Sequence, residues 1–395
     1  MDLVVELTRE RGMSTILITH DLGLAATYCD QVVVMEKGKV VENATSRAIF
    51  TAPAHAYTRK LMRATPRPGK LLRDLLPEDA TVLSEPARLP ANVMSLTDKI
   101  SEQKPLLVVD KLVKEYPRKG LEGFGGAFKK ALRRKPAPEP EMFRAVDGIS
   151  FVINRGESVG LVGESGCGKS TTSTMVMRLI DRTSGTITFN GENIGEIPAN
   201  EFSHSPMRKR IQMVFQDPTD SLNPRFSAAR AIADPILRLG DVKGSAALRA
   251  RCEELAGQVG LPIELLDRFP HQLSGGQKAR VGIARAIAMQ PDLVILDEPT
   301  AALDVSVQAV VLNLLQELKD SLGMSYLFVS HDLNVVRLLC DRVIVMKAGK
   351  IVEEGVTEKV MSAPQAQYTR DLLAAIPEPT FEKEPAQPSR FVATL

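Results

Sequence analysis

The sequence predicts an α/β fold in which buried parallel strands alternate with helices, beside a smaller antiparallel sheet. Short apolar segments recur between helical patterns throughout the second half of the chain. A glycine-rich turn joins one of these segments to a helix, and a long segment near the N-terminus is repeated near the C-terminus. Strand–helix alternation around buried strands is typical of a doubly wound sheet.

Composition indicates a soluble globular protein with two or three domains. The 395 residues include 50 Lys+Arg and 48 Asp+Glu, a net charge of +2, which gives no general attraction to nucleic acid or anionic lipid. The 4 cysteines are far apart and lack a CxxC pair, which excludes a disulfide scaffold and favours a reducing compartment. No apolar run reaches the roughly 18 residues of a membrane helix, and the charged N-terminus is atypical of a signal peptide. We therefore expect a cytoplasmic protein.

A repeat organises the chain. The segment from Met13 matches that from Met324, and the offset of 311 holds without a gap from Leu3/Leu314 to Pro66/Pro377. Because a long α/β pattern precedes the second copy alone, we expect the first to be the remnant of a domain whose front is missing. A truncated gene, a misplaced start and a shortened clone are alternative causes. The expected division is 1–65 for the C-terminal remnant of the first domain, 66–105 for a Pro-rich linker, 106–376 for a complete domain and 377–395 for a flexible tail.

Periodicity places the elements. Strands are expected at 106–116, 148–153, 158–163, 211–215, 293–297, 326–330 and 342–346, and helices at 169–180, 227–239, 245–259, 275–289, 305–322 and 333–340. The first two strands alternate and predict the antiparallel sheet. In the remnant, strands near 15–19 and 31–35 would lack parallel neighbours and expose their edges. The basic insert 118–135 is read as a solvated loop rather than an amphipathic membrane helix.

The turn GESGCGKS at 163–170 follows a buried strand and opens a helix, as a phosphate-binding loop does. Its glycines let successive N–H groups point at phosphate oxygens, and the helix adds positive charge. Lys169 is expected on the β/γ phosphates, Ser170 on Mg²⁺ and Thr171 on the α-phosphate. A structural glycine turn would not require Lys169 and Ser170. The residues expected to contact the bound phosphates are Gly163, Glu164, Ser165, Gly166, Cys167, Gly168, Lys169, Ser170 and Thr171.

The segment LVILDEP at 293–299 delivers two carboxylates to the end of a buried strand. Asp297 would hold Mg²⁺ through bound water, and Glu298 would polarise the attacking water. Alone, the pair reads better as a helix cap before Pro299. With a phosphate loop upstream, the catalytic interpretation is the better one.

A third motif, LSGGQ at 273–277, frees backbone N–H groups before another helix and predicts a second anion site. Two phosphate sites in one domain are explained if each nucleotide lies between two domains. The partner would then supply Ser274, Gly275, Gly276 and Gln277. A Ser-capped helix start explains the geometry but not the other motifs.

With these motifs in this order, residues 106–376 resemble the nucleotide-binding domain of an ABC transporter, a P-loop (RecA-like) ATPase with an antiparallel β subdomain and a helical signature subdomain. The resemblance implies ATP and Mg²⁺ as ligands. It also implies adenine stacking by Tyr116, with Phe143 as competitor, and Mg²⁺ ligation by Gln216. Asp304 would cross the dimer interface, and His331 would hydrogen-bond the γ-phosphate.

The segments 217–225 and 298–308, and the tails Pro53–Leu61 and Pro364–Leu372, resemble the ATPase subunits of oligopeptide, dipeptide and nickel importers, which are sometimes tandem fusions. The resemblance implies ATP-driven uptake of peptides or related solutes at the cytoplasmic face of the inner membrane. The implied partners are permease subunits, a periplasmic or extracellular solute-binding protein and a second nucleotide-binding domain, without nucleic acid. The alternatives are a soluble ABC protein on ribosomes or DNA, and a truncated inactive remnant.

Overall fold

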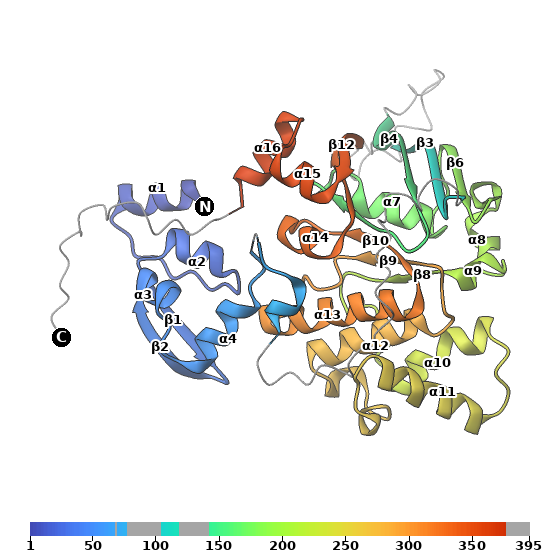
Figure 1. Cartoon of the computed structure of the whole chain (residues 1–395), viewed down its shortest axis with the longest axis horizontal. Helices are drawn as coiled ribbons and strands as arrows, with labels where there is room; N and C mark the ends of the chain where they lie inside the picture. Colours follow the sequence, from blue (N-terminus) through green and yellow to red (C-terminus); the bar gives the residue numbers. More distant parts are fainter. Residues whose placement is uncertain (68, 77–103, 118–141, 377–395) are drawn as a thin grey trace, which may run out of the picture.

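The computed structural model describes residues 1–67, 69–76, 104–117 and 142–376. These residues form an N-terminal unit (residues 1–76) and a C-terminal unit (residues 104–376), which lie side by side in Figure 1. The basic insert 118–135, the tail 377–395 and most of the segment 66–105 lie outside the described residues.

The C-terminal unit is built around a sheet of six strands in the order β12-β11-β5-β10-β9-β8. Strands β8 to β11 and β5 run parallel, and β12 pairs antiparallel at one edge. Every residue of β5, β9 and β10 is buried, as apolar runs covered on both faces require. The bounds are β5 Ser158–Val162, β8 Ile211–Val214, β9 Leu293–Asp297, β10 Ser325–Val329, β11 Arg342–Lys347 and β12 Lys350–Val356.

The predicted antiparallel sheet lies beside it, in the order β4-β3-β6-β7. Its strands are β3 Leu107–Pro117, β4 Met142–Ile153, β6 Ser184–Phe189 and β7 Glu192–Asn193. The sequence pattern located the first two of these strands but not the last two.

Helices flank the large sheet. They are α7 Lys169–Val176, α8 Ala199–Phe202, α9 Met207–Arg210, α10 Ala228–Leu239, α11 Ser245–Gln258, α12 Gly275–Ile287, α13 Val305–Leu322, α14 Leu333–Leu339, α15 Thr357–Ser362 and α16 Gln367–Ala374. Helix α7 stops before the expected residue 180, because Arg178 adopts a left-handed φ of 57°. None of the described helices is long and apolar enough to span a bilayer.

Two apolar cores lie on opposite faces of the large sheet. Leu293 and Ile295 of β9 point into the core shared with the antiparallel sheet and α7. Val294 and Leu296 point into the core shared with α10 to α13. The twofold alternation of strand side chains thus divides one apolar run between two layers.

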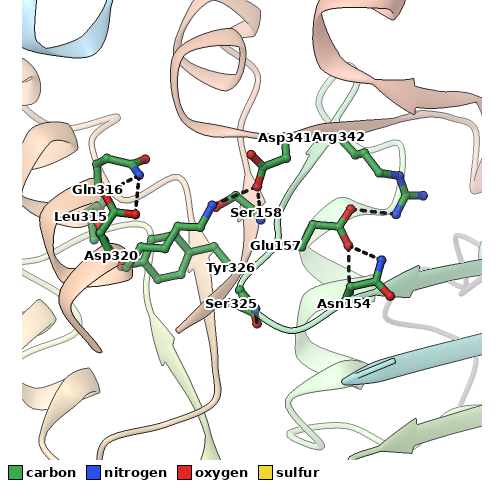
Figure 2. A network of polar contacts seen from close by, with 12 residues as sticks. Asn154, Glu157, Ser158, Leu315, Gln316, Asp320, Ser325, Tyr326, Asp341 and Arg342 are labelled. Atoms are coloured by element: carbon green, nitrogen blue, oxygen red, sulfur yellow. Dashed lines mark hydrogen bonds and ion pairs between the residues drawn. The ribbon is translucent and has the colours of Figure 1, made fainter. Parts of the chain in front are cut away.

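Polar contacts fix the amino-terminal edge of the parallel strands (Figure 2). The Ser158 N–H donates to the Asp341 carboxylate over 2.8 Å, which joins β5 to β11. Glu157 accepts from Arg342 over 3.0 Å and from the Asn154 backbone over 2.8 Å. These bonds hold the strands in register, so the loops at their carboxyl ends are held in register as well.

The N-terminal unit reproduces the end of the C-terminal unit at the 311-residue offset. Its elements are α1 Asp2–Arg11, α2 Leu22–Tyr28, β1 Gln31–Glu36, β2 Lys39–Thr45, α3 Ser46–Thr51, α4 Ala56–Ala64 and the 3-10 helix η1 Leu72–Leu75. The bulge at Val34/Met35 repeats the bulge at Val345/Met346.

The strand expected near 15–19 is absent, which corrects the sequence prediction. Its counterpart β10 is held by pairing with both β5 and β9. In the described part of the chain no strand pairs with residues 15–19, and Ile16 and Ile18 are 90% and 94% exposed. The strand expected near 31–35 forms β1, which among the described residues pairs with β2 alone, and its Val33 and Met35 side chains are 52% and 57% exposed.

A turn within the expected linker anchors the N-terminal unit to α13. Ala64, Leu72 and Leu75 are buried in the core on that side of the sheet. The Asn313 amide donates to the Leu72 carbonyl over 2.9 Å. The beginning of the linker is therefore packed structure rather than extended chain.

We predict that Leu75→Ala destabilises this packing. Leu75 is fully buried, so truncation should lower the free energy of unfolding by about 2–5 kcal/mol. Urea denaturation followed by circular dichroism measures this value. Leu71→Ala is the matched control, since Leu71 is 54% exposed. Equal effects of the two variants would contradict the anchoring role.

Candidate functional site

The loop between β5 and α7 has a backbone that glycine alone accommodates. Gly163 and Gly168 adopt φ values of 147° and 108°. A Cβ atom on Gly163 would lie 2.2 Å from the Met346 carbonyl oxygen. A Cβ atom on Gly168 would lie 2.4 Å from the carbonyl oxygen of Ala145. The loop is thus pressed against β11 and β4.

Lys169 begins α7, at the positive end of the helix dipole. Its side chain is buried, and Nζ donates to the carbonyl oxygens of Gly163 over 2.7 Å and Glu164 over 3.0 Å. Burial raises the pKa of the neighbouring Cys167 thiol, which therefore stays protonated. The loop carries one fixed cation and a row of amides, a combination suited to an anion.

Asp297 ends β9 beside this loop. Its carboxylate is buried, and Oδ1 lies 3.5 Å from the Ser170 hydroxyl. Burial raises the pKa of Asp297, and the negative charge of Glu298 adds to the effect. A buried carboxylate next to a hydroxyl offers two oxygen ligands of the kind that Mg²⁺ prefers.

The Glu298 carboxylate contacts two other predicted site residues, Gln216 and His331. It accepts a hydrogen bond from Gln216 Nε2 over 2.9 Å and lies 3.1 Å from His331 Nδ1. The three residues follow β8, β9 and β10, so the carboxyl ends of neighbouring parallel strands bring them together. Glu298 has a left-handed φ of 46°, a strained conformation that clusters at functional sites.

The electrostatics of this group follow from the same contacts. The hydrogen bond with His331 lowers the pKa of Glu298, and it raises the pKa of His331. Glu298 is therefore ionised at neutral pH, beside the buried Asp297.

Tyr116 and Phe143 form a cross-strand pair in the antiparallel sheet. They are 38% and 46% exposed, so both rings remain accessible. Lys114 Nζ lies 5.1 Å from the centre of the Tyr116 ring. The two candidates for adenine stacking thus lie next to each other.

The segment 273–277 lies apart from this group. The Ser274 hydroxyl caps α12 by accepting from the Gln277 N–H over 3.3 Å, and Gln277 Oε1 accepts from the Ser274 N–H over 2.9 Å. Gly276 packs so closely on α13 that a Cβ atom would lie 2.6 Å from Val307. Asp304 occupies the N-cap position of α13 without a capping hydrogen bond from its side chain. Among the described residues no hydrogen bond joins residues 274–277 to the phosphate loop.

An interunit cleft of about 700 Å³ lies over the ionisable group. The C-terminal unit lines it with Glu164, Glu298 and His331. The N-terminal unit lines it with residues 20–23 and 65–67, which include His20, the repeat counterpart of His331.

Sequence reasoning missed Tyr368. Its hydroxyl accepts a hydrogen bond from the Glu164 N–H over 3.1 Å. The signal was present, because Tyr368 stands in the tail Pro364–Leu372 that repeats Pro53–Leu61. Without the fold, nothing connected that tail with a loop two hundred residues earlier.

Two family models match the chain. Residues 146–301 match the model described as ABC transporter. Residues 41–91 and 352–391 each match the model of the oligopeptide/dipeptide transporter C-terminal region. The two matches of the second model begin 311 residues apart, the offset of the internal repeat.

Curated relatives cover nearly the whole chain. It is 40% identical over 379 residues to the glutathione import ATP-binding protein GsiA of Salmonella paratyphi A, a match over 95% of this chain and 58% of that protein. It is 38% identical over 392 residues to the protein of the same name from Escherichia coli strain K12, over 99% of this chain and 59% of the relative. The chain therefore spans less than two thirds of these relatives.

Solved structures share the fold. A dimeric post-hydrolysis structure of the ATP-binding cassette MJ0796 with ADP and Pi matches with a TM-score of 0.54 and 27% identity, over 64% of this chain and 98% of that one. The cbiO1 protein of Clostridium perfringens, part of the cbiONQ ABC transporter complex, matches with a TM-score of 0.53 and 28% identity, over 66% and 92% of the chains. The C-terminal unit has the α/β P-loop fold of an ABC ATPase.

We predict that the pKa of His331 depends on Glu298. Glu298→Gln removes the carboxylate charge, so the raised pKa of His331 should fall toward its ordinary value. A two-dimensional NMR titration of the imidazole measures this change. An unaltered pKa of His331 in the variant would contradict the contact.

The two pKa shifts determine how the free energy of unfolding depends on pH. Because the pKa of His331 is raised on folding, its contribution is complete below the unfolded-state pKa and is lost as pH rises through the folded-state pKa. Because the pKa of Glu298 is lowered, its contribution is lost as pH falls through that folded-state pKa. The pair should stabilise the fold most between these limits.

Proposed function

We propose that this chain, an ABC transporter ATP-binding protein of the oligopeptide/dipeptide family, couples ATP hydrolysis to the import of peptide-like solutes. The observation that carries the proposal is the convergence of Gln216, Glu298 and His331 beside the phosphate loop. A helix cap alone would not bring two residues from neighbouring strand ends onto the carboxylate at the end of a third strand.

ATP binds along the phosphate loop in this proposal. The amides of residues 165–168 and the N-terminus of α7 receive the phosphates, and Lys169 moves from the loop carbonyls to the β/γ phosphates. The adenine stacks on Tyr116, with Phe143 beside it. Thr171 contacts the α-phosphate.

The residues present fit Mg²⁺. Asp297 and Ser170 supply a carboxylate and a hydroxyl beside the loop, and Gln216, which contacts the neighbouring Glu298, would supply an amide oxygen. Mg²⁺ is usually held by one or two carboxylates together with substrate phosphates and water. When bound, the ion neutralises charge on the phosphates.

Glu298 polarises the attacking water. Its lowered pKa keeps the carboxylate ionised, and the strained backbone together with the bonds from Gln216 and His331 fixes its direction. The His331 ring, which follows β10 and contacts Glu298, hydrogen-bonds the γ-phosphate in this proposal. A base of this type contributes about 10²–10⁴-fold in rate.

The signature residues act on a nucleotide held by another domain. Ser274, Gly275, Gly276 and Gln277 stand at a capped helix N-terminus, and the Ser274 side chain is exposed. Within the described residues they make no hydrogen bond with the loop of their own unit. Two domains therefore close around two nucleotides, with Asp304 at their interface.

The N-terminal unit is the C-terminal part of a second ABC domain. The internal repeat, the second match to the C-terminal region model and the recurrence of most of the elements at the 311-residue offset support this. Its His20 and Asp21 lie in the interunit cleft opposite His331 and Asp332. Such a chain resembles part of a tandem fusion.

Import would require partner proteins that form the membrane channel and deliver the solute. Permease subunits would receive the closing motion at the cytoplasmic face of the membrane, and a solute-binding protein would deliver the cargo. The relatives named as glutathione import proteins point to small peptides or glutathione-like solutes as that cargo.

Glu298→Gln tests the catalytic role. The amide keeps the shape of the side chain but cannot accept a proton, so ATP affinity should persist while turnover falls by about 10²–10⁴-fold. Phosphate release measures turnover, and fluorescent-nucleotide titration measures affinity. The exposed Glu192→Gln is the matched control and should retain both. Unchanged turnover in Glu298→Gln would refute the assigned role.

The same variant tests composite sites. Slow hydrolysis should trap the closed pair, so ATP and Mg²⁺ should shift Glu298→Gln from one chain to two in light scattering after gel filtration. Adding Ser274→Arg should abolish the shift by blocking the signature. A variant that binds ATP and stays monomeric would instead indicate that an additional partner ATPase is required or that the chain is inactive.

A further inference from the structure

Tyr368 connects the C-terminal helix with the phosphate loop. It lies in the first turn of α16, and its hydroxyl accepts the Glu164 N–H over 3.1 Å. The ring is 8% exposed, and Lys347 Nζ lies 4.5 Å from its centre. The hydroxyl is therefore held against the first residue after Gly163, where the loop leaves β5.

Hydrogen bonds that do not involve the Tyr368 hydroxyl also fix the position of this residue. Glu353 accepts from the N–H groups of Gln365 over 2.7 Å and Ala366 over 3.1 Å, which ties the start of α16 to β12. The Gly349 N–H donates to the Cys167 carbonyl over 2.9 Å, so the β11–β12 hairpin holds the far side of the loop. Residues after Val345 thus hydrogen-bond the phosphate loop near both of its ends, at Glu164 and at Cys167.

The repeat provides an internal comparison. In the N-terminal unit, Glu42 accepts from the N–H groups of Ala54 over 2.8 Å and His55 over 3.0 Å, as Glu353 does in the other unit. Tyr57 takes the place of Tyr368 at the start of α4. Within the described part of the chain, the Tyr57 hydroxyl makes no hydrogen bond to a phosphate loop. The Glu42 bonds and the start of α4 therefore form without a hydrogen bond from the tyrosine hydroxyl to a phosphate loop.

We propose that Tyr368 is a positioning residue for ATP binding, whose hydroxyl holds the entrance of the phosphate loop in the conformation that receives the phosphates. This inference rests on the proposed function of the loop. Preorganised donors bind an anion better than donors that must first be ordered. Removal of the hydroxyl frees the Glu164 amide and the start of the loop, while the reacting groups on β8, β9 and β10 keep their places. The effect therefore falls on nucleotide affinity rather than on turnover.

The test uses the full chain with Tyr368→Phe, Tyr57→Phe as the matched control, and Lys169→Ala as the variant that abolishes binding. Titration with a fluorescent ATP analogue and Mg²⁺ gives Kd, phosphate release gives KM and kcat, and thermal unfolding gives Tm. In Tyr368→Phe we expect Kd and KM to rise about threefold to tenfold, the range of one hydrogen bond, with kcat changed less than about twofold. Tm should stay at the wild-type value, and Tyr57→Phe should match the wild type throughout.

The contrary outcomes are distinct. An unchanged Kd in Tyr368→Phe, a fall in kcat alone, an equal rise of Kd in Tyr57→Phe, or a loss of affinity explained by a lower Tm would overturn the positioning role. Failure of the wild-type chain to bind the ATP analogue more tightly than Lys169→Ala would overturn the proposed function, and this inference with it.

Discussion

The arrangement of the C-terminal unit depends on the close approach of the phosphate loop to the backbones of two strands. Met346 of β11 and Ala145 of β4 leave no room for a side chain at Gly163 and Gly168. The loop therefore packs against one strand of the large sheet and one strand of the antiparallel sheet. A rigid backbone of this kind presents dipoles that need no rearrangement when an anion arrives.

The ionisable group depends on strand order. Since β10, β9 and β8 are neighbours, the residues after them meet at one edge, and a hydrogen-bonded carboxylate can link all three strand ends. The buried Asp297 beside the ionised Glu298 concentrates negative charge next to the Lys169 ammonium. Such a balance suits a ligand that brings both phosphates and a divalent cation.

Much of the fold and of the candidate site could be predicted from the sequence. Buried parallel strands leave unbroken apolar runs, and the residues of the phosphate loop have a fixed spacing. β12 was missed because four of its seven residues are exposed at a sheet edge. A strand was wrongly expected near 15–19 because its sequence repeats that of β10, although without paired neighbours the segment lacks the hydrogen bonds that hold β10. The resemblance, not the spacing, grouped Gln216 with His331. The left-handed backbone of Glu298 and the contact of Tyr368 with the loop arise from tertiary packing, which no local pattern records.

The packing of Leu72 and Leu75 on α13 has a consequence for handling the protein. These contacts join the units through side chains and not through the intervening peptide bonds. A break in the backbone anywhere between residues 77 and 103 would leave two pieces that migrate together in native gel filtration and separate in a denaturing gel. The size of the native particle is therefore no measure of whether its backbone is intact.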